Sequence, residues 1–165
     1  MFKSTKILEL GSCCFRQEAA KEGRNAGTRS HRCSYTHGYL LRGKFEFSTN
    51  ELDHRNWCVD YGGLSGLKEI LKNQFDHTLL CAKNDSLLPL YQELHDKGGC
   101  DLRIMDGVGI EKTAEWCYHA AQAFIDQETN GRCWVSKVEV WEHELNSAIY
   151  IPPFGDPFKY FPTHE

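Results

Sequence analysis

The chain has 165 residues, 41% hydrophobic and 25% charged, a composition typical of one globular domain with a core of its own. Its net charge of −4, scattered along the sequence, argues against a nucleic-acid-binding protein, which usually carries a basic stripe. The N-terminus lacks the apolar stretch of a signal peptide, and no segment has the length of a membrane span. We therefore expect a cytoplasmic protein without membrane contact.

Eight cysteines occur without a C-x-x-C pair, which favours reduced thiols over a disulfide framework. Residues 7–15 are predicted to form a first strand. Residues 17–30, which are charged and contain glycine, are predicted to form a loop, or a short helix followed by a loop. Residues 39–47 are predicted to form a second strand, because apolar and charged side chains alternate there with a period of two. A polar turn region follows at residues 48–56.

Apolar residues at helical spacing predict helices over residues 64–75, 87–97 and 111–128. A loop is expected after the first of these helices, and a short strand is possible at residues 101–105. Alternation then predicts a C-terminal hairpin of strands 135–141 and 147–151. Strands, helices and strands in this ββααββ order predict an α+β fold, with a four-stranded antiparallel sheet and helices on one face.

The predicted domain covers residues 1–151 and is followed by a tail, residues 152–165. The tail holds four prolines among the aromatic residues Phe154, Phe158, Tyr160 and Phe161. Proline at this density excludes a regular helix or a central strand. Exposed aromatic side chains are a liability on a monomer, so we expect the tail to dock on its own domain or on a neighbour.

Cys33 and His37 lie four residues apart at the start of the second predicted strand. A thiolate paired with an imidazole can act as a base or a nucleophile, which makes this pair a candidate catalytic site. The alternative is a structural cysteine beside a histidine that only begins a strand.

Asp76 and His77 follow a predicted helix, and a carboxylate beside an imidazole can fix its tautomer. Their alternative is a histidine that interacts with the helix dipole.

Two further groups are candidates for ligand binding. Glu142 follows the predicted strand 135–141 and could accept paired N–H donors from a heterocycle, although Glu139 and Glu144 compete for this role. Thr113 and Glu115 lie in the segment Lys112-Thr113-Ala114-Glu115 at the start of the long helix. Helix N-termini attract anions, but threonine and glutamate are also ordinary helix-capping residues.

Together these segments resemble the 6-pyruvoyltetrahydropterin synthase / 6-carboxytetrahydropterin synthase family over residues 7–150. The family has a cysteine, three residues and then His-Gly-His before a strand, and residues 33–39 of this chain, CSYTHGY, take that place. Its first helix begins after Asp-Phe, matched by Asp60-Tyr61, and is followed by Leu-Asp-His, matched by Phe75-Asp76-His77. Its Pro-Thr-x-Glu-Asn motif is partly matched by residues 112–116, and its Glu-Thr by Glu142-His143.

The resemblance implies the tunnelling fold, in which subunits pair their sheets into a trimer or a hexamer with active sites between subunits. It implies the substrate 7,8-dihydroneopterin triphosphate, elimination of triphosphate, and a step of tetrahydropterin or queuosine biosynthesis. Cys33 would be the general base, Asp76 and His77 its relay, and Glu142 the pterin anchor. Thr113 and Glu115 would be further substrate contacts.

The family also binds zinc with three histidines, and this chain departs from that pattern. His37 matches one ligand, but Tyr39 replaces the second. Depending on the alignment, Lys21 or Phe15 stands at the third, first-strand position. A catalytic zinc ion needs about three protein ligands, so the replacements are expected to abolish the site. Cys13, Cys14 or His31 could serve as substitute ligands.

Two functions from different classes follow. The first is a divergent pterin synthase, still a lyase, with altered metal dependence. The alternative is a non-catalytic tunnelling-fold homologue, a pseudoenzyme that serves as an oligomeric structural or ligand-binding protein. A small-molecule sensor that binds a pterin without turnover lies between them. The zinc content of the purified protein and its turnover of dihydroneopterin triphosphate distinguish these hypotheses.

Overall fold

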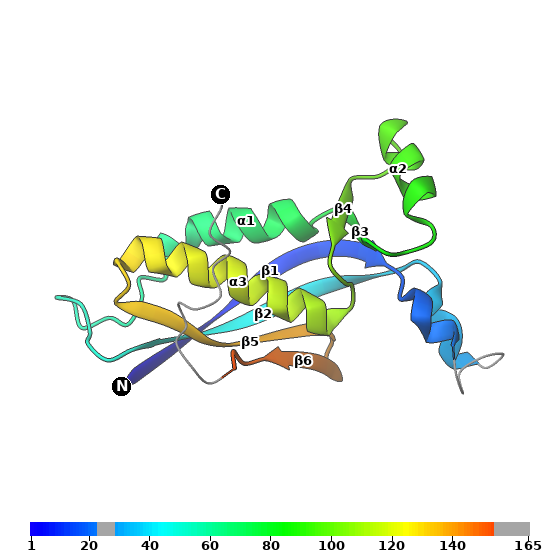
Figure 1. Cartoon of the computed structure of the whole chain (residues 1–165). Helices are drawn as coiled ribbons and strands as arrows, with labels where there is room; N and C mark the ends of the chain where they lie inside the picture. Colours follow the sequence, from blue (N-terminus) through cyan, green and yellow to red (C-terminus); the bar gives the residue numbers. More distant parts are fainter. Residues whose placement is uncertain (23–28, 154–165) are drawn as a thin grey trace.

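The computed structural model describes residues 1–22 and 29–153 and shows a curved sheet with helices packed against it (Figure 1). The strands are β1 (Phe2–Phe15), β2 (His37–Thr49), β3 (Thr78–Ala82), β4 (Leu102–Met105), β5 (Cys133–His143) and β6 (Asn146–Tyr150). The α-helices are α1 (Ser65–Phe75), α2 (Leu88–Asp96) and α3 (Ile110–Thr129). Three short 3-10 helices, η1 (Glu18–Lys21), η3 (Arg29–Ser34) and η4 (Gly62–Leu64), lie in the connections.

The sheet corrects the prediction of four antiparallel strands. It has six strands over the described residues, in the order β4-β3-β1-β2-β5-β6. The pairs β1–β2, β2–β5 and β5–β6 are antiparallel, as expected, but β3 pairs in parallel with both β1 and β4. Residues 78–82, expected in a loop, form β3. This short apolar run shows no alternation because it is buried on both faces, so its period could not reveal a strand.

β1, β2 and β5 are each longer than their patterns predicted. β1 begins at Phe2, and its first residues pair with the last residues of β2. β5 continues to His143, so Glu142 lies inside a strand and not beyond its end. The three helices lie within a few residues of their predicted bounds, and the short strand at residues 101–105 is β4.

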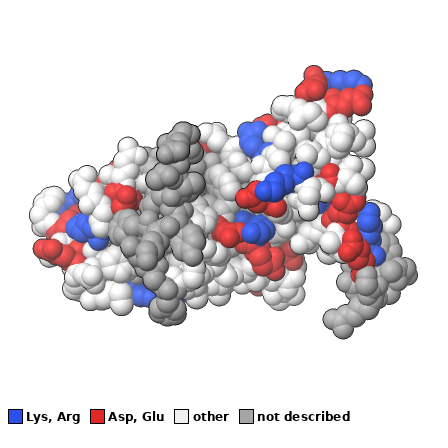
Figure 2. Space-filling view, viewed as in Figure 1, with Lys and Arg blue, Asp and Glu red and all other residues white. Residues whose placement is uncertain are grey.

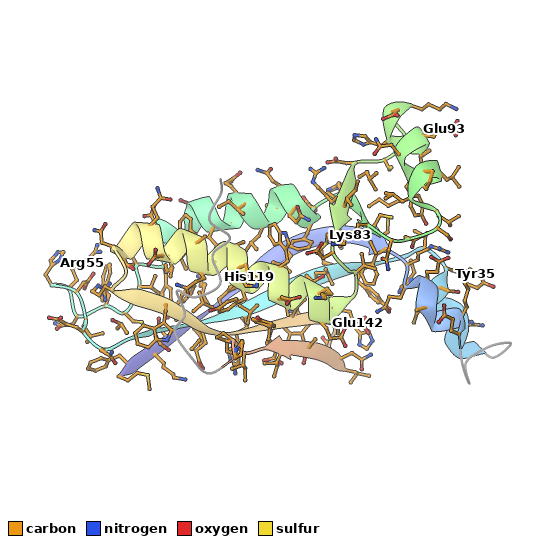
Figure 3. The ribbon with its side chains drawn as sticks, viewed as in Figure 1. Tyr35, Arg55, Lys83, Glu93, His119 and Glu142 are labelled. Atoms are coloured by element: carbon orange, nitrogen blue, oxygen red, sulfur yellow. The ribbon has the colours of Figure 1, made fainter. Side chains whose placement is uncertain are left out.

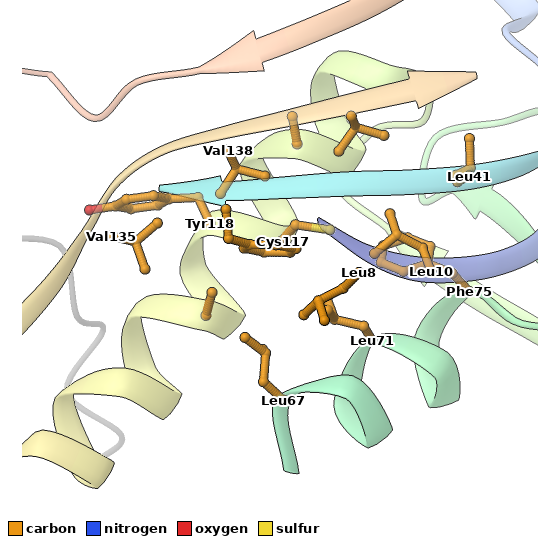
Figure 4. Close-up of a cluster of buried hydrophobic side chains, with 14 of the residues drawn as sticks. Leu8, Leu10, Leu41, Leu67, Leu71, Phe75, Cys117, Tyr118, Val135 and Val138 are labelled. Atoms are coloured by element: carbon orange, nitrogen blue, oxygen red, sulfur yellow. The ribbon is translucent and has the colours of Figure 1, made fainter. Parts of the chain in front are cut away.

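Helices α1 and α3 cover one face of the sheet, and the main core lies between these two layers (Figure 4). Leu67, Leu71 and Phe75 recur at helical spacing on α1 and are fully buried. They meet Leu10 of β1 and the buried face of α3 in one cluster. Burying each such side chain contributes about 1.5–3 kcal/mol, so this apolar stripe fixes which face of α1 meets the sheet.

Helix α2 stands apart from α1 and α3, beside β3 and β4 (Figure 1). It packs through a second, smaller cluster of Leu79, Cys81, Tyr91 and Leu102. None of the described helices is long and apolar enough to cross a bilayer. The docking predicted for the C-terminal tail concerns residues that lie, from position 154 onward, outside the described part of the chain.

Gly11 interrupts the pairing of β1 with β2 and lies against Asp76. The register shifts between Glu9 and Gly11, and Gly11 has a φ of 111°. A Cβ atom at this position would lie 2.4 Å from Cβ and 2.6 Å from Cα of Asp76. We expect Gly11→Ala to lower the free energy of unfolding by about 3–4 kcal/mol, because backbone strain adds to overpacking. Urea unfolding measures this loss.

Gly98→Ala is the matched control for that substitution. Gly98 also has a positive φ, 75°, but no atom lies within 4 Å of a Cβ added there. Its expected loss is about 1–2 kcal/mol, from the backbone alone. Equal losses at the two positions would show that the contact with Asp76 carries no energetic weight.

Candidate functional site

Cys33, His37, Tyr39 and Glu142 line one cavity of about 520 Å³. Cys33 comes from η3, His37 and Tyr39 from β2, and Glu142 from β5. Figure 3 shows Glu142 beside the N-terminal end of α3, and Tyr35 on the projecting segment that carries Cys33. The structure thus brings together four of the residues singled out from the sequence, from three separate segments.

The pairing of β1 with β2 places three rings side by side in this cavity. Phe15 lies opposite His37, and Cys13 opposite Tyr39. The ring centroids are 5.3 Å apart for Phe15 and His37, 6.0 Å for Phe15 and Tyr39, and 5.3 Å for His37 and Tyr39. Phe15, and not Lys21, therefore holds the first-strand position beside His37.

The hydrogen bond of His37 fixes its tautomer. Nδ1 lies 2.7 Å from the carbonyl oxygen of Tyr35. A carbonyl oxygen can only accept, so Nδ1 carries the proton and donates. In the neutral ring the lone pair is then on Nε2, which can accept a proton or a hydrogen bond from a ligand.

Glu142 and Tyr39 form the polar side of the cavity. Asn146 donates from Nδ2 to Oε1 of Glu142 over 2.9 Å, and Nε2 of His143 lies 3.7 Å from the same oxygen. Burial raises the pKa of Tyr39, and the charges of Glu142 and Cys33 and a hydrogen bond with Glu142 raise it further. Tyr39 is therefore a neutral phenol at physiological pH.

The residues present do not fit the zinc ion that the resemblance implies. Phe15 offers no donor atom and Tyr39 replaces an imidazole, so His37 remains alone of the expected three. No group of three potential ligands for a metal ion occurs among residues 1–22 and 29–153. Cys13 and Cys14, considered as substitute ligands, therefore do not form such a group with His37, and burial raises the pKa of both thiols. The side chain of His31 lies outside the described part.

Asp76 and His77 do form a pair, but in a different place. Nδ1 of His77 lies 3.0 Å from Oδ1 of Asp76, and the backbone N–H of Ser12 donates to the same oxygen over 3.1 Å. This backbone hydrogen bond is the main cause that lowers the pKa of Asp76. The His77 side chain is 85% exposed and lines a second cavity, of about 570 Å³, which Cys33 and Glu142 do not line. Within one chain the pair is therefore not a relay for Cys33.

Thr113 and Glu115 lie outside the Cys33 cavity. Thr113 is fully buried in the face of α3 that meets the sheet. Glu115 forms an ion pair with Lys112, in which Nζ lies 2.5 Å from Oε2. Other residues line the cavity in their place, and the sequence had not singled them out: Gln17, Glu111 and Asn146. They follow β1, begin α3 and begin β6, respectively, so only the folded chain brings them to one cavity.

Residues 14–153 match the family described as 6-pyruvoyl tetrahydropterin synthase, and the chain belongs to this family. A search of curated proteins gives no significant match. Among solved structures, the chain is similar to an uncharacterized protein from Wolinella succinogenes, at 17% identity and a TM-score of 0.74, over 91% of this chain and 97% of that one.

Two solved 6-pyruvoyl tetrahydropterin synthases are also similar to this chain. The enzyme from Plasmodium vivax, in a variant of a catalytic residue, is 13% identical with a TM-score of 0.62, over 91% of this chain and 98% of that one. The enzyme from Caenorhabditis elegans is 14% identical with a TM-score of 0.61, over 92% and 95%. Likeness at these identities shows the shared fold, a mixed α+β sheet with helices.

Proposed function

We propose that this protein is a divergent lyase that eliminates triphosphate from a dihydropterin such as 7,8-dihydroneopterin triphosphate, without a zinc ion. The observation that carries the proposal is the shared cavity of Cys33, Tyr39 and Glu142 in a chain of this family. A cavity of this size accommodates a small heterocyclic ligand. Pterin-related chemistry is the function that family membership supports.

Each residue has a defined chemical role in this proposal. The carboxylate of Glu142 accepts hydrogen bonds from paired N–H groups on the edge of the heterocycle. Cys33, as a thiolate, takes a proton from a carbon of the ligand side chain. The electron pair of that C–H bond then expels the triphosphate, and one carbon–oxygen bond breaks. No step needs a metal-bound oxygen.

We further propose that Asp76 and His77 complete the cavity of a neighbouring copy in a trimer or a hexamer. β1 pairs with β3 only at Cys13 and Cys14, so within the described residues the earlier part of β1 has one edge without a partner strand. β6 has an outer edge of the same kind. Unpaired sheet edges favour association through strand pairing, which would bring His77 of one copy toward Cys33 of another.

Turnover and metal content test the function together. We expect the purified protein to release triphosphate from 7,8-dihydroneopterin triphosphate while holding less than about 0.1 zinc per chain. Elemental analysis measures the metal, and chromatography the pterin product and the triphosphate. Activity that disappears with a chelator and returns with zinc would contradict the metal-free mechanism.

A non-catalytic pterin-binding protein is the second candidate. The replacement of two zinc ligands by Phe15 and Tyr39 favours it, because the rings that remain pack against one another. This candidate predicts binding of a dihydropterin without release of triphosphate. Isothermal titration combined with the turnover assay separates it from the lyase.

A further inference from the structure

Cys33 lies on a segment that belongs to neither the sheet nor an α-helix. Residues 32–36, here called the cysteine segment, comprise the end of the 3-10 helix η3 and the two residues that follow it. Short 3-10 helices have poor hydrogen-bond geometry and depend on their surroundings. The place of the thiol is therefore set by contacts between this segment and other parts of the chain.

Besides the hydrogen bond of His37 to Tyr35, contacts with Gln17, Arg16 and Tyr91 hold the cysteine segment. The backbone N–H of Gln17 donates to the carbonyl of Cys33 itself, over 2.7 Å. Nη1 of Arg16 donates to the carbonyl of Ser34 over 3.4 Å. The hydroxyls of Thr36 and Tyr91 lie 2.6 Å apart. Tyr91 belongs to α2, so that helix contacts the segment directly.

Arg16 is itself held by a buried carboxylate. Nη2 lies 2.7 Å from Oδ1 of Asp85, and Nε lies 2.9 Å from Oδ2, a bidentate pair. The two side chains are 9% and 2% exposed. Oδ1 of Asp85 also accepts the backbone N–H of Leu87, just before α2, over 2.8 Å. The pair thus joins the end of β1 to the start of α2.

A second link runs parallel to the first. Oε2 of Glu18 accepts the backbone N–H of Ser86 over 2.9 Å, and the Ser86 hydroxyl donates to the same carboxylate. These bonds to Ser86 lower the pKa of Glu18 to about 2. The β3–α2 connection therefore contacts both Arg16 and Glu18, which follow β1.

A buried ion pair adds little net stability, because desolvation offsets the Coulombic attraction. Such pairs are retained where they fix one geometry among several. Here the guanidinium that Asp85 orients also contacts Ser86 and Glu18, and its Nη1 donates to the carbonyl of Ser34, the residue next to Cys33. The pair is thus built to place a backbone segment.

We propose that Arg16, Asp85 and Tyr91 are positioning residues, and that the start of α2 is the template that aims the thiol of Cys33 into the cavity lined by Glu142. This inference rests on the proposed function, in which Cys33 acts on a ligand held by Glu142. A displacement of about 1 Å at a reacting group can lower a rate by about 10²-fold, so the template governs turnover more than binding.

The test replaces the ion pair by apolar residues of similar size. We expect Arg16→Met/Asp85→Leu to keep the melting temperature within about 5 °C, since neither charge is left buried alone. It should lower kcat for triphosphate release by about 30–100-fold and change KM by less than about 3-fold. Tyr91→Phe removes only the bond to Thr36 and should lower kcat by about 3–10-fold.

The control is an exposed ion pair near the same helix. Nζ of Lys83 lies 2.7 Å from Oδ1 of Asp106, with both side chains mostly exposed. Lys83→Met/Asp106→Asn should leave kcat, KM and the melting temperature unchanged. A fall in kcat in this control equal to that of the buried pair would overturn the inference.

Hydrogen–deuterium exchange supplies a readout that does not depend on turnover. Peptides covering residues 32–36 should exchange at least about 10-fold faster in the Arg16/Asp85 variant, with the rest of the sheet unchanged. Unchanged exchange there, or an unchanged kcat, overturns the positioning role. A wild-type protein that releases no triphosphate overturns the proposed function. Faster exchange in the variant would then show that the ion pair positions the segment, but the role of this positioning in catalysis would be overturned.

Discussion

Cys33→Ala is expected to lower kcat for triphosphate release by about 10²–10⁴-fold, the contribution that a positioned general base makes. KM should change little, because in the proposed function Glu142 on β5, and not Cys33, binds the heterocycle. Cys33 is exposed, so its removal leaves no cavity in the core and the melting temperature should stay the same. Steady-state kinetics and thermal unfolding on one preparation give both numbers.

A second cysteine serves as the matched control. Cys100 is half-buried and lines the other cavity, with His77. No step of the proposed mechanism uses the Cys100 thiol, so Cys100→Ala should leave kcat unchanged within about 2-fold while lowering stability slightly. If Cys33→Ala keeps full activity while Cys100→Ala loses it, the catalytic thiol lies in the second cavity and the proposed site is wrong.

Phe15→His/Tyr39→His is expected to bind about one zinc ion per chain, where we expect the unmodified protein to bind none. The ring centroids at positions 15, 37 and 39 lie 5.3–6.0 Å apart, so three imidazoles there can converge on one ion. The bond of His37 Nδ1 to the carbonyl of Tyr35 leaves Nε2 for the metal and orients the ring. Elemental analysis after dialysis, and zinc competition with a chromogenic chelator, measure the site.

The metal-free form of this variant should be less stable than the parent by about 2–4 kcal/mol. Phe15 is 2% exposed, and a histidine there loses packing and buries a polar ring. Zinc binding should recover this loss, because the ion binds only the folded state. Tyr39→His alone, with two imidazoles, is the control and should bind zinc at least about 100-fold more weakly. A folded double variant without zinc would show that the backbone no longer matches a metal site.

The sequence predicted those elements whose side chains follow one clear period. The leucines of α1 and the alternation along β2 reported buried faces directly, and both elements lie where they were expected. β3 was missed because a strand covered on both faces has no polar side from which a period can be read. The sheet was therefore predicted as four antiparallel strands, and the parallel pair beside β1 was absent from it.

The site was predictable only in part, for a related reason. Cys33 and His37 are close in sequence, and Glu142 joined them through the family motif, so these three residues of the first cavity were named in advance, whereas Gln17, Glu111 and Asn146 were not. Asp76 and His77 form their pair, but the sequence could not show on which side of β1 it lies. Arg16 and Asp85 are 69 residues apart and match no motif, so only the folded chain reveals their contact.

The large sequence separation of these contacts also affects the order of events during folding. The cysteine segment lies between β1 and β2, yet Tyr91, which contacts it, and Asp85, which orients Arg16, come from the later half of the domain. A hairpin of β1 and β2 that forms early, during synthesis or refolding, still lacks them. Contacts between residues far apart in the sequence form late in folding, because they must offset the conformational entropy that is lost when the intervening chain is closed into a loop. The thiol is therefore expected to reach its working position among the last events of folding, and a partly folded chain would carry Cys33 without being able to use it.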